Sequence, residues 1–342
     1  MAKQTDIQVL MVGGKRCGKT TILADMMEGS VDALEGKLKI SPVNDGQHTK
    51  LWSSYCVATD YFDEDIHPKG AILFTDENKN FDRQDYSFSV GIPGVEDSNL
   101  HVTFVDVPGE WFDPLSENHE DAERLLKESN VLIIAVDTPC LMDETVKGRG
   151  VLHVEYNKSE SITNGITKGI NDLKGDISNR LVLFVPIKCE DYYNQNKMSD
   201  VTEMVKEGYC KLIDYFKSSD LENSTTVAIM PILSMGGMEF VAFKHDPEKG
   251  RYMEGFQITG SFKPQFCEQP LFSAMMLLLL EATNKIKPSN WFTKWLAKRK
   301  QKNGKFTADV AQDMFNVIKP LLRGNDSQNG FEVIQDPLNI FM

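Results

Sequence analysis

Near its start the chain carries glycines, a lysine and a hydroxyl group at a spacing that could hold a chain of phosphates. The eight residues are Gly13, Gly14, Lys15, Arg16, Cys17, Gly18, Lys19 and Thr20. The glycines allow backbone N–H groups to turn inward around an anion. Lys19 could reach the β- and γ-phosphates of a nucleotide, and the Thr20 hydroxyl could bind Mg²⁺. We therefore expect residues 13–21, including Thr21, to bind a nucleoside triphosphate.

This glycine loop lies between a predicted strand and a predicted helix. Residues 7–12 form a short, mostly apolar run, and residues 20–28 have helical character. The N-terminus of a helix adds a partial positive charge that favours a phosphate. The order of strand, glycine loop and helix is what distinguishes a phosphate-binding loop from a chance glycine-rich turn.

A second motif follows the apolar strand predicted over residues 101–107. Asp106 could hold Mg²⁺ at the strand tip, and the backbone N–H of Gly109 could sense the γ-phosphate. A switch threonine should complete the metal site, with Thr75 as first choice and Thr59 as second. Glu110 is a candidate to orient water, although a nearby anionic phosphate would raise its pKa and weaken that role. The alternative is a solvated acid at a helix start.

In the order of these motifs the chain resembles the Ras-like, translation-factor-related (TRAFAC) class of P-loop GTPases, over roughly residues 5–287. The resemblance implies a base-reading motif after the fifth strand, where this chain has Ile187-Lys188-Cys189-Glu190. The carboxylate of Glu190, or of Asp191, would accept hydrogen bonds from guanine N1 and N2 while the stem of Lys188 packs on the ring. The turn at Ser234 resembles a degenerate form of the one that reads guanine O6.

Three further features of the sequence each allow more than one interpretation. Arg16 has the spacing found in guanylate-binding proteins, a resemblance that implies an arginine finger when two nucleotide domains meet; the alternative is an arginine in solvent. The long first insertion and residues 107–110 look like bacterial double-GTPase-type proteins, which implies a switch acting with a partner protein. Cys17 lies at a helix start between cations, where a thiolate is favoured, but a small filler residue is the simpler interpretation.

The hydrophobic pattern predicts an α/β fold with a doubly wound, mostly parallel sheet, the P-loop NTPase architecture. We expect an antiparallel edge strand at 86–92, a P-loop GTPase domain over 1–287 and a C-terminal helical tail over 288–342. The domain should carry a switch-region insertion at 29–85 and a hairpin insertion at 235–270. The predicted strands are 7–12, 86–92, 101–107, 131–137, 181–187 and 226–233, and the helices 20–28, 119–129, 157–173, 199–218 and 270–287.

The amino-acid composition limits the kinds of partner that this protein is expected to bind. The net charge of −13 over 342 residues argues against nucleic-acid binding, which needs a basic surface. The apolar run at 272–280 is shorter than the about 20 residues that cross a bilayer. Six scattered cysteines without a C-x-x-C pair suggest neither zinc nor disulfides, and we expect a cytoplasmic protein. The basic run 298–302 after Trp291 and Trp295 predicts either a solvated helical arm or a contact with membrane or partner.

These observations predict a guanine-nucleotide switch that binds GTP or GDP with Mg²⁺, hydrolyses GTP slowly and acts with a protein partner. Nucleotide-dependent dimerisation would follow from a role for Arg16. The alternatives are an ATP-dependent P-loop enzyme and a nucleotide-locked structural module.

Overall fold

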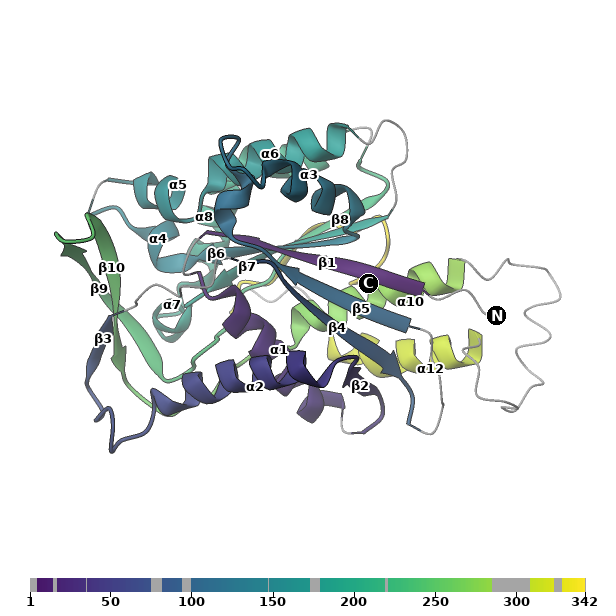
Figure 1. Cartoon of the computed structure of the whole chain (residues 1–342), viewed down its shortest axis with the longest axis horizontal. Helices are drawn as coiled ribbons and strands as arrows, with labels where there is room; N and C mark the ends of the chain where they lie inside the picture. The colour runs from purple at the N-terminus through teal and green to yellow at the C-terminus, as the bar shows by residue number, and fades with distance from the viewer. Residues whose placement is uncertain are drawn as a thin grey trace.

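A mixed sheet forms the centre of the molecule in a computed structural model (Figure 1). The structure describes residues 5–14, 17–34, 36–74, 82–93, 100–146, 148–172, 179–218, 221–284, 308–322 and 328–341. In spatial order the strands of the sheet are β11 (Glu332–Gln335), β8 (Thr225–Ile229), β7 (Arg180–Ile187), β6 (Val131–Asp137), β1 (Thr5–Gly13), β5 (Leu100–Asp106), β4 (Gln84–Gly91) and β2 (Lys39–Pro42).

The sheet is mostly parallel. From β8 to β5 all neighbouring strands run parallel, whereas β4, β2 and β11 pair antiparallel with their neighbours. Every residue of β6 and β7 is buried, which explains their continuous apolar runs without alternation. The expected mostly parallel α/β sheet is confirmed. The prediction that the strand near residue 86 forms an edge is wrong, because β2 pairs outside it.

Helices cover both faces of this sheet. One face carries α1 (Lys19–Leu34), α10 (Gln269–Asn284) and α12 (Ala308–Ile318), with α2 (Asp45–Asp60) packed on α1. The opposite face carries α3 (His119–Glu128), α6 (Ser159–Asn171), α8 (Met198–Gly208) and α9 (Cys210–Phe216). Each layer encloses its own apolar core, so the sheet is sandwiched as a doubly wound fold requires.

Short elements follow the carboxyl ends of the strands. They are η1 (Gly109–Phe112), α4 (Thr138–Met142), α5 (Val151–Tyr156) and α7 (Glu190–Asn194), and η2 (Lys319–Leu321) follows α12. The helix predicted over 199–218 is divided at Tyr209, whose buried ring packs against His153 and Phe184. The expected helical tail also contains a strand, β11. Trp291, Trp295 and the basic run 298–302 lie outside the described residues.

A second, three-stranded sheet lies at one end of the molecule, on the left of Figure 1. It consists of β3 (Ile72–Phe74), β10 (Arg251–Ile258) and β9 (Met238–Asp246), and we call it the accessory sheet. Its strands come from the two segments predicted as insertions, 29–85 and 235–270, which therefore meet in space. Met238, Phe256 and Ile258 form its small core. Within the described part of the chain, no helix combines the length and the apolar character that crossing a bilayer requires.

Candidate functional site

Most of the predicted site residues follow the carboxyl ends of the parallel strands β1, β5, β7 and β8, which lie at the same edge of the sheet (Figure 1). Strand β1 lies between β5 and β6, a point of an open α/β sheet at which ligands bind. The turns after β1 and β5 touch directly: a Cβ atom added to Gly109 would lie 2.3 Å from the carbonyl oxygen of Gly13. Only glycine allows this approach, so Gly109 is held against the glycine loop.

Lys19 folds back over the glycine loop. Its Nζ donates to the carbonyl oxygens of Gly13 and Gly14, at 3.3 and 3.4 Å. Gly18 has a φ of 84°, a conformation that favours glycine, and its carbonyl accepts the N–H of Ile22 as α1 begins. The Lys19 ammonium is thus held at the loop itself. Lys15 and Arg16 lie outside the described residues.

Thr20 and Asp106 are in direct contact. The Thr20 hydroxyl at the start of α1 donates to Oδ2 of Asp106 at the end of β5, at 2.8 Å. A hydroxyl and a carboxylate are the hard oxygen ligands that Mg²⁺ prefers, so these residues fit the predicted metal site. Thr75 lies outside the described residues. Thr59 donates its hydroxyl to the carbonyl oxygen of Cys56 within α2.

Acidic groups surround Lys19. Burial alone would lower the pKa of Lys19, but Cys17, Asp106 and Glu110 outweigh it and raise that pKa. Glu110, in η1, is therefore near enough to Lys19 to affect its charge. The expectation of a favoured thiolate at Cys17 is wrong, because burial raises the pKa of this thiol. Thr21 lies beside Thr20 in the first turn of α1, half-buried.

The predicted base-reading residues Glu190 and Ser234 come together. Glu190 is 4% exposed, and its Oε1 accepts the backbone N–H groups of Met235 and Gly236 at 2.8 and 3.2 Å. Burial raises the pKa of Glu190, although these N–H bonds oppose the change. The turn after the buried Ser234 therefore already uses the carboxylate that would read guanine. Asp191 accepts from Gln195 in its own helix instead.

Lys188 is held by two carboxylates. It lies just past β7 with a φ of 57°, and its Nζ forms ion pairs with Asp137 at the end of β6 and with Glu254 of β10. Burial opposes the charge on Lys188, but Asp137 and Glu254 outweigh it and raise its pKa. Burial, followed by the charge of Asp137, raises the pKa of Glu254 to about 7. The net pKa of Asp137 is lowered, because Lys188 and hydrogen bonds overcome its burial.

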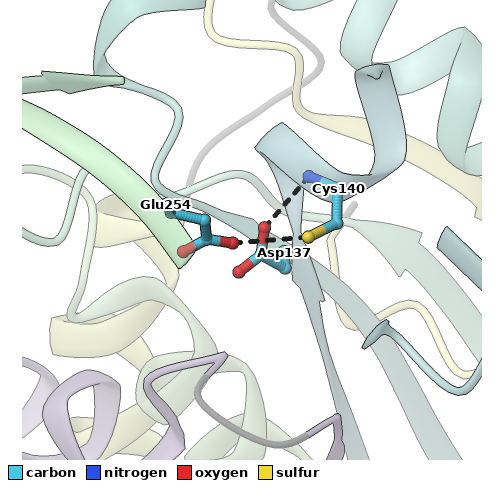
Figure 2. A group of neighbouring side chains, drawn as sticks. All are labelled: Asp137, Cys140 and Glu254. Atoms are coloured by element: carbon cyan, nitrogen blue, oxygen red, sulfur yellow. Dashed lines mark hydrogen bonds between the residues drawn. The ribbon is translucent and has the colours of Figure 1, made fainter. Parts of the chain in front are cut away.

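Figure 2 shows the two carboxylates of this cluster together with Cys140. The Sγ of Cys140 lies 3.3 Å from Oε1 of Glu254, and the Cys140 N–H donates to Asp137. One ligand atom from each of Asp137, Cys140 and Glu254 lies within 4.8 Å of the others. The Lys188 ammonium already pairs with both carboxylates, so the arrangement is an ion-pair cluster that joins the accessory sheet to the main sheet.

Sequence reasoning missed this cluster, and it also missed Asp25. Asp25, on the buried side of α1, is 1% exposed, and neither of its carboxylate oxygens has a hydrogen-bond partner. Burial, followed by the charge of Glu190, raises the pKa of Asp25 to about 8. Asp25 is therefore uncharged at neutral pH. A single acid within the apolar run Ile22 to Met27 was the only signal for it.

An open cavity of about 300 Å³ lies beside the predicted metal site. Its lining residues are Lys50, Arg83, Gln84, Asp85 and Tyr86. Gln84 pairs with Asp106 in the sheet, and the Nζ of Lys50 donates to Gln84 at 3.0 Å. Arg83 pairs with Asp85. Helix α2 thus brings a lysine toward the strand end that carries Asp106.

No protein-family model matches the sequence, and no curated protein is significantly similar to it. Among solved structures, the chain is similar to the S. cerevisiae Ski7 GTPase-like domain bound to GTP, at 12% identity and a TM-score of 0.35, over 68% of this chain and 43% of that one. The chain is also similar to the same domain bound to GDP and inorganic phosphate, at 13% identity and a TM-score of 0.38, over 84% of this chain and 52% of that one. The chain thus spans about half the length of these Ski7 chains.

A third similar structure is the ADP-ribosylation-factor-like GTP-binding protein, or small COPII coat GTPase SAR1, from Encephalitozoon cuniculi in complex with GDP. Its identity is 9% and its TM-score 0.25, over 74% of this chain and 67% of that one. These similarities are too distant to assign a role to any residue.

Proposed function

We propose that this chain is a guanine-nucleotide switch that binds and slowly hydrolyses GTP with Mg²⁺ and couples its nucleotide state to a protein partner. The observation that supports this most directly is the contact between Thr20 and Asp106, beside a lysine folded over a glycine loop. A hydroxyl and a carboxylate from two different elements meet beside the glycine loop, and together they would hold Mg²⁺, which would supply positive charge to bound phosphates.

On this proposal, Lys19 exchanges the carbonyl oxygens of Gly13 and Gly14 for the β- and γ-phosphates. Thr20 and Asp106 would hold Mg²⁺, with Thr75 as the candidate third ligand from the chain. Bound Mg²⁺ would neutralise charge on the phosphates. The N–H of Gly109, held against the loop by its close approach to Gly13, would register whether the γ-phosphate is present.

Slow hydrolysis is proposed because the residue after Gly109 is an acid. A carboxylate at Glu110 can accept a proton from water but cannot donate a hydrogen bond as an amide can. Arg16 would supply a cation when two copies meet, which makes nucleotide-dependent dimerisation part of the proposal. Guanine preference would require Glu190 to exchange the N–H groups of Met235 and Gly236 for the two donors of the base.

A second candidate function is a module that binds nucleotide and does not hydrolyse it. Glu110 favours this alternative, because a carboxylate after Gly109 cannot donate a hydrogen bond as an amide can and is a weak orienter of an attacking water. Phosphate release distinguishes the two functions.

The test is a titration of fluorescent GTP and ATP with Mg²⁺, followed by measurement of phosphate release. Lys19→Ala should weaken binding on the order of tenfold to a hundredfold, since it removes charged hydrogen bonds to phosphate. Lys211→Ala, at an exposed position of α9, is the matched control and should bind as wild type. Absence of nucleotide binding by wild type would refute the proposal, and equal affinity for GTP and ATP would refute guanine preference alone.

A further inference from the structure

The accessory sheet lies against the residues that would read the base. We propose that it is a gate over the base end of the nucleotide site, closed by the ion pair between Glu254 and Lys188, and that nucleotide entry opens it. This inference rests on the proposed function. It adds a positioning residue, Glu254, that comes from a segment far from the glycine loop in the sequence.

The first support is that Lys188 and its two carboxylate partners are largely covered. The side chain of Lys188 is 12% exposed, and those of Asp137 and Glu254 are each 7% exposed. A purine that packs on the stem of Lys188 needs a free face of that stem. Because most of the Lys188 side chain is covered, the groups that cover it must move before a base can pack on the stem.

The second support is the identity of the cover. Two residues of β10 contact Lys188: the carboxylate of Glu254 and the ring of Phe256, whose centroid lies 5.6 Å from Nζ. Phe256 belongs to the core of the accessory sheet, and Met235 packs against that same core. The turn that would read guanine O6 therefore packs on the same sheet, and a movement of β10 would uncover Lys188 and change the packing of Met235.

The third support is the way the hairpin joins the domain. Gly236 has a φ of 72°, and a Cβ atom on Gly237 would lie 2.3 Å from the carbonyl oxygen of Ser261. The two legs of the hairpin thus touch through glycine backbone, at the place where a rotation would occur. Further out, polar contacts tie the hairpin down: Asn194 to Glu239 at 2.6 Å, and the N–H of Tyr252 to the hydroxyl of Tyr156 at 2.8 Å.

The charge balance around Lys188 indicates that Glu254 is the residue that holds the gate closed. Lys188 has two carboxylate partners, so loss of Glu254 leaves it paired one-to-one with Asp137. Replacing Glu254 should loosen the gate and leave the main sheet with a balanced ion pair. A second acid beside Asp137 also carries a repulsion that opening would relieve.

The experiment is stopped-flow binding of a fluorescent guanine nucleotide with Mg²⁺. Glu254→Gln should raise the association rate constant on the order of tenfold, within the usual range of coupling between two sites. Glu248→Gln, an exposed acid at the tip of the same hairpin, should bind at the wild-type rate. If Glu254→Gln does not fold, Glu254→Asp offers a shorter, weaker latch with the same charge.

A second measurement does not depend on a variant. Amide hydrogen exchange of residues 251–258 in wild type should increase when nucleotide saturates the protein. Unchanged exchange, or equal association rates for wild type and the Glu254 variants, would overturn the gate while leaving nucleotide binding intact. A wild-type protein that binds no nucleotide would overturn the proposed function and, with it, the gate.

Discussion

Thr20 and Asp106 form a 2.8 Å hydrogen bond between the first turn of α1 and the end of β5, although 86 residues separate them in the sequence. The parallel pairing of β1 with β5 brings them together, because Met11 of β1 lies opposite Asp106. The hydroxyl and the carboxylate would both face a metal that bridges a phosphate chain. Their contact makes the charge of Asp106 the simplest property of the site to test.

Asp106→Asn should keep the hydrogen bond with Thr20 and remove the charge. We expect the affinity for guanine nucleotide to lose its dependence on Mg²⁺, with a decrease on the order of 10- to 100-fold at saturating metal. Binding measured with Mg²⁺ and with a chelator checks this. Glu117→Gln, exposed in the segment after β5, should retain the metal dependence. If Asp106→Asn responds to Mg²⁺ as wild type does, Asp106 is not a ligand of the metal.

Asp25 should make stability depend on pH. Its pKa is raised from 3.8 to about 8, so the native state keeps a proton that the unfolded chain has lost. Between these values stability should fall by about 1.4 kcal/mol per pH unit as the pH rises. The acidic groups that face Asp25 are Glu190 and Cys267, both buried.

Asp25→Asn imitates the protonated acid and should abolish this loss. Its free energy of unfolding in urea should exceed that of wild type by about 1–2 kcal/mol at pH 5 and by several kcal/mol more at pH 8, because the loss in wild type begins above the unfolded pKa of 3.8. Asp214→Asn, at an exposed position of α9, should follow wild type at both pH values. Equal pH dependence of wild type and Asp25→Asn would show that Asp25 is ionised in the native protein.

Much of the main sheet could be predicted because its signals are local. The runs in β6 and β7 are apolar at nearly every position, and strands buried on both faces require that. The glycine loop is likewise defined by spacing within eight residues. The strand β3 could not be predicted, because Ile72–Phe74 are too few to show a period and gain their partner only when β10 folds beside them.

At the base end of the site, too, contacts between distant segments could not be predicted from the sequence. Lys188 could be identified from its place after a strand, but Glu254 is 66 residues away in a hairpin with no motif of its own. Nothing in the local sequence pairs these two residues; the packing of the accessory sheet does. Glu190 could be singled out as an acid, yet its engagement with the N–H groups of Met235 and Gly236 depends on how two distant turns meet.

Glu190 should have separable effects on stability and on base choice. Glu190→Ala leaves two N–H groups without their acceptor and should lower the free energy of unfolding by about 1–3 kcal/mol. Glu190→Gln keeps an acceptor oxygen and should cost less. Both variants should lose any preference for GDP over ADP, measured by competition. A Glu190→Gln protein that still prefers GDP would exclude Glu190 as the base reader.

Nucleotide association should speed up as the pH falls from 8 to 6. The groups that face Glu254 are Asp137 of β6, Cys140 of α4 and Lys188 after β7. The pKa of Glu254 is about 7, that of Asp137 is lowered, and those of Cys140 and Lys188 are raised, so among these four groups Glu254 is the one that changes charge in this window. Protonation neutralises Glu254 and should release Lys188 from the accessory sheet.

The expected increase approaches that produced by Glu254→Gln, on the order of tenfold, because the low-pH wild type and this variant both lack the charge. Glu254→Gln should have a flat profile, and Glu248→Gln should follow wild type. The phosphates of the nucleotide also titrate in this range, but equally for all three proteins, so the ratio of rates isolates the protein. If the pH profiles of wild type and Glu254→Gln are parallel, the ion pair of Glu254 does not control the rate of nucleotide entry.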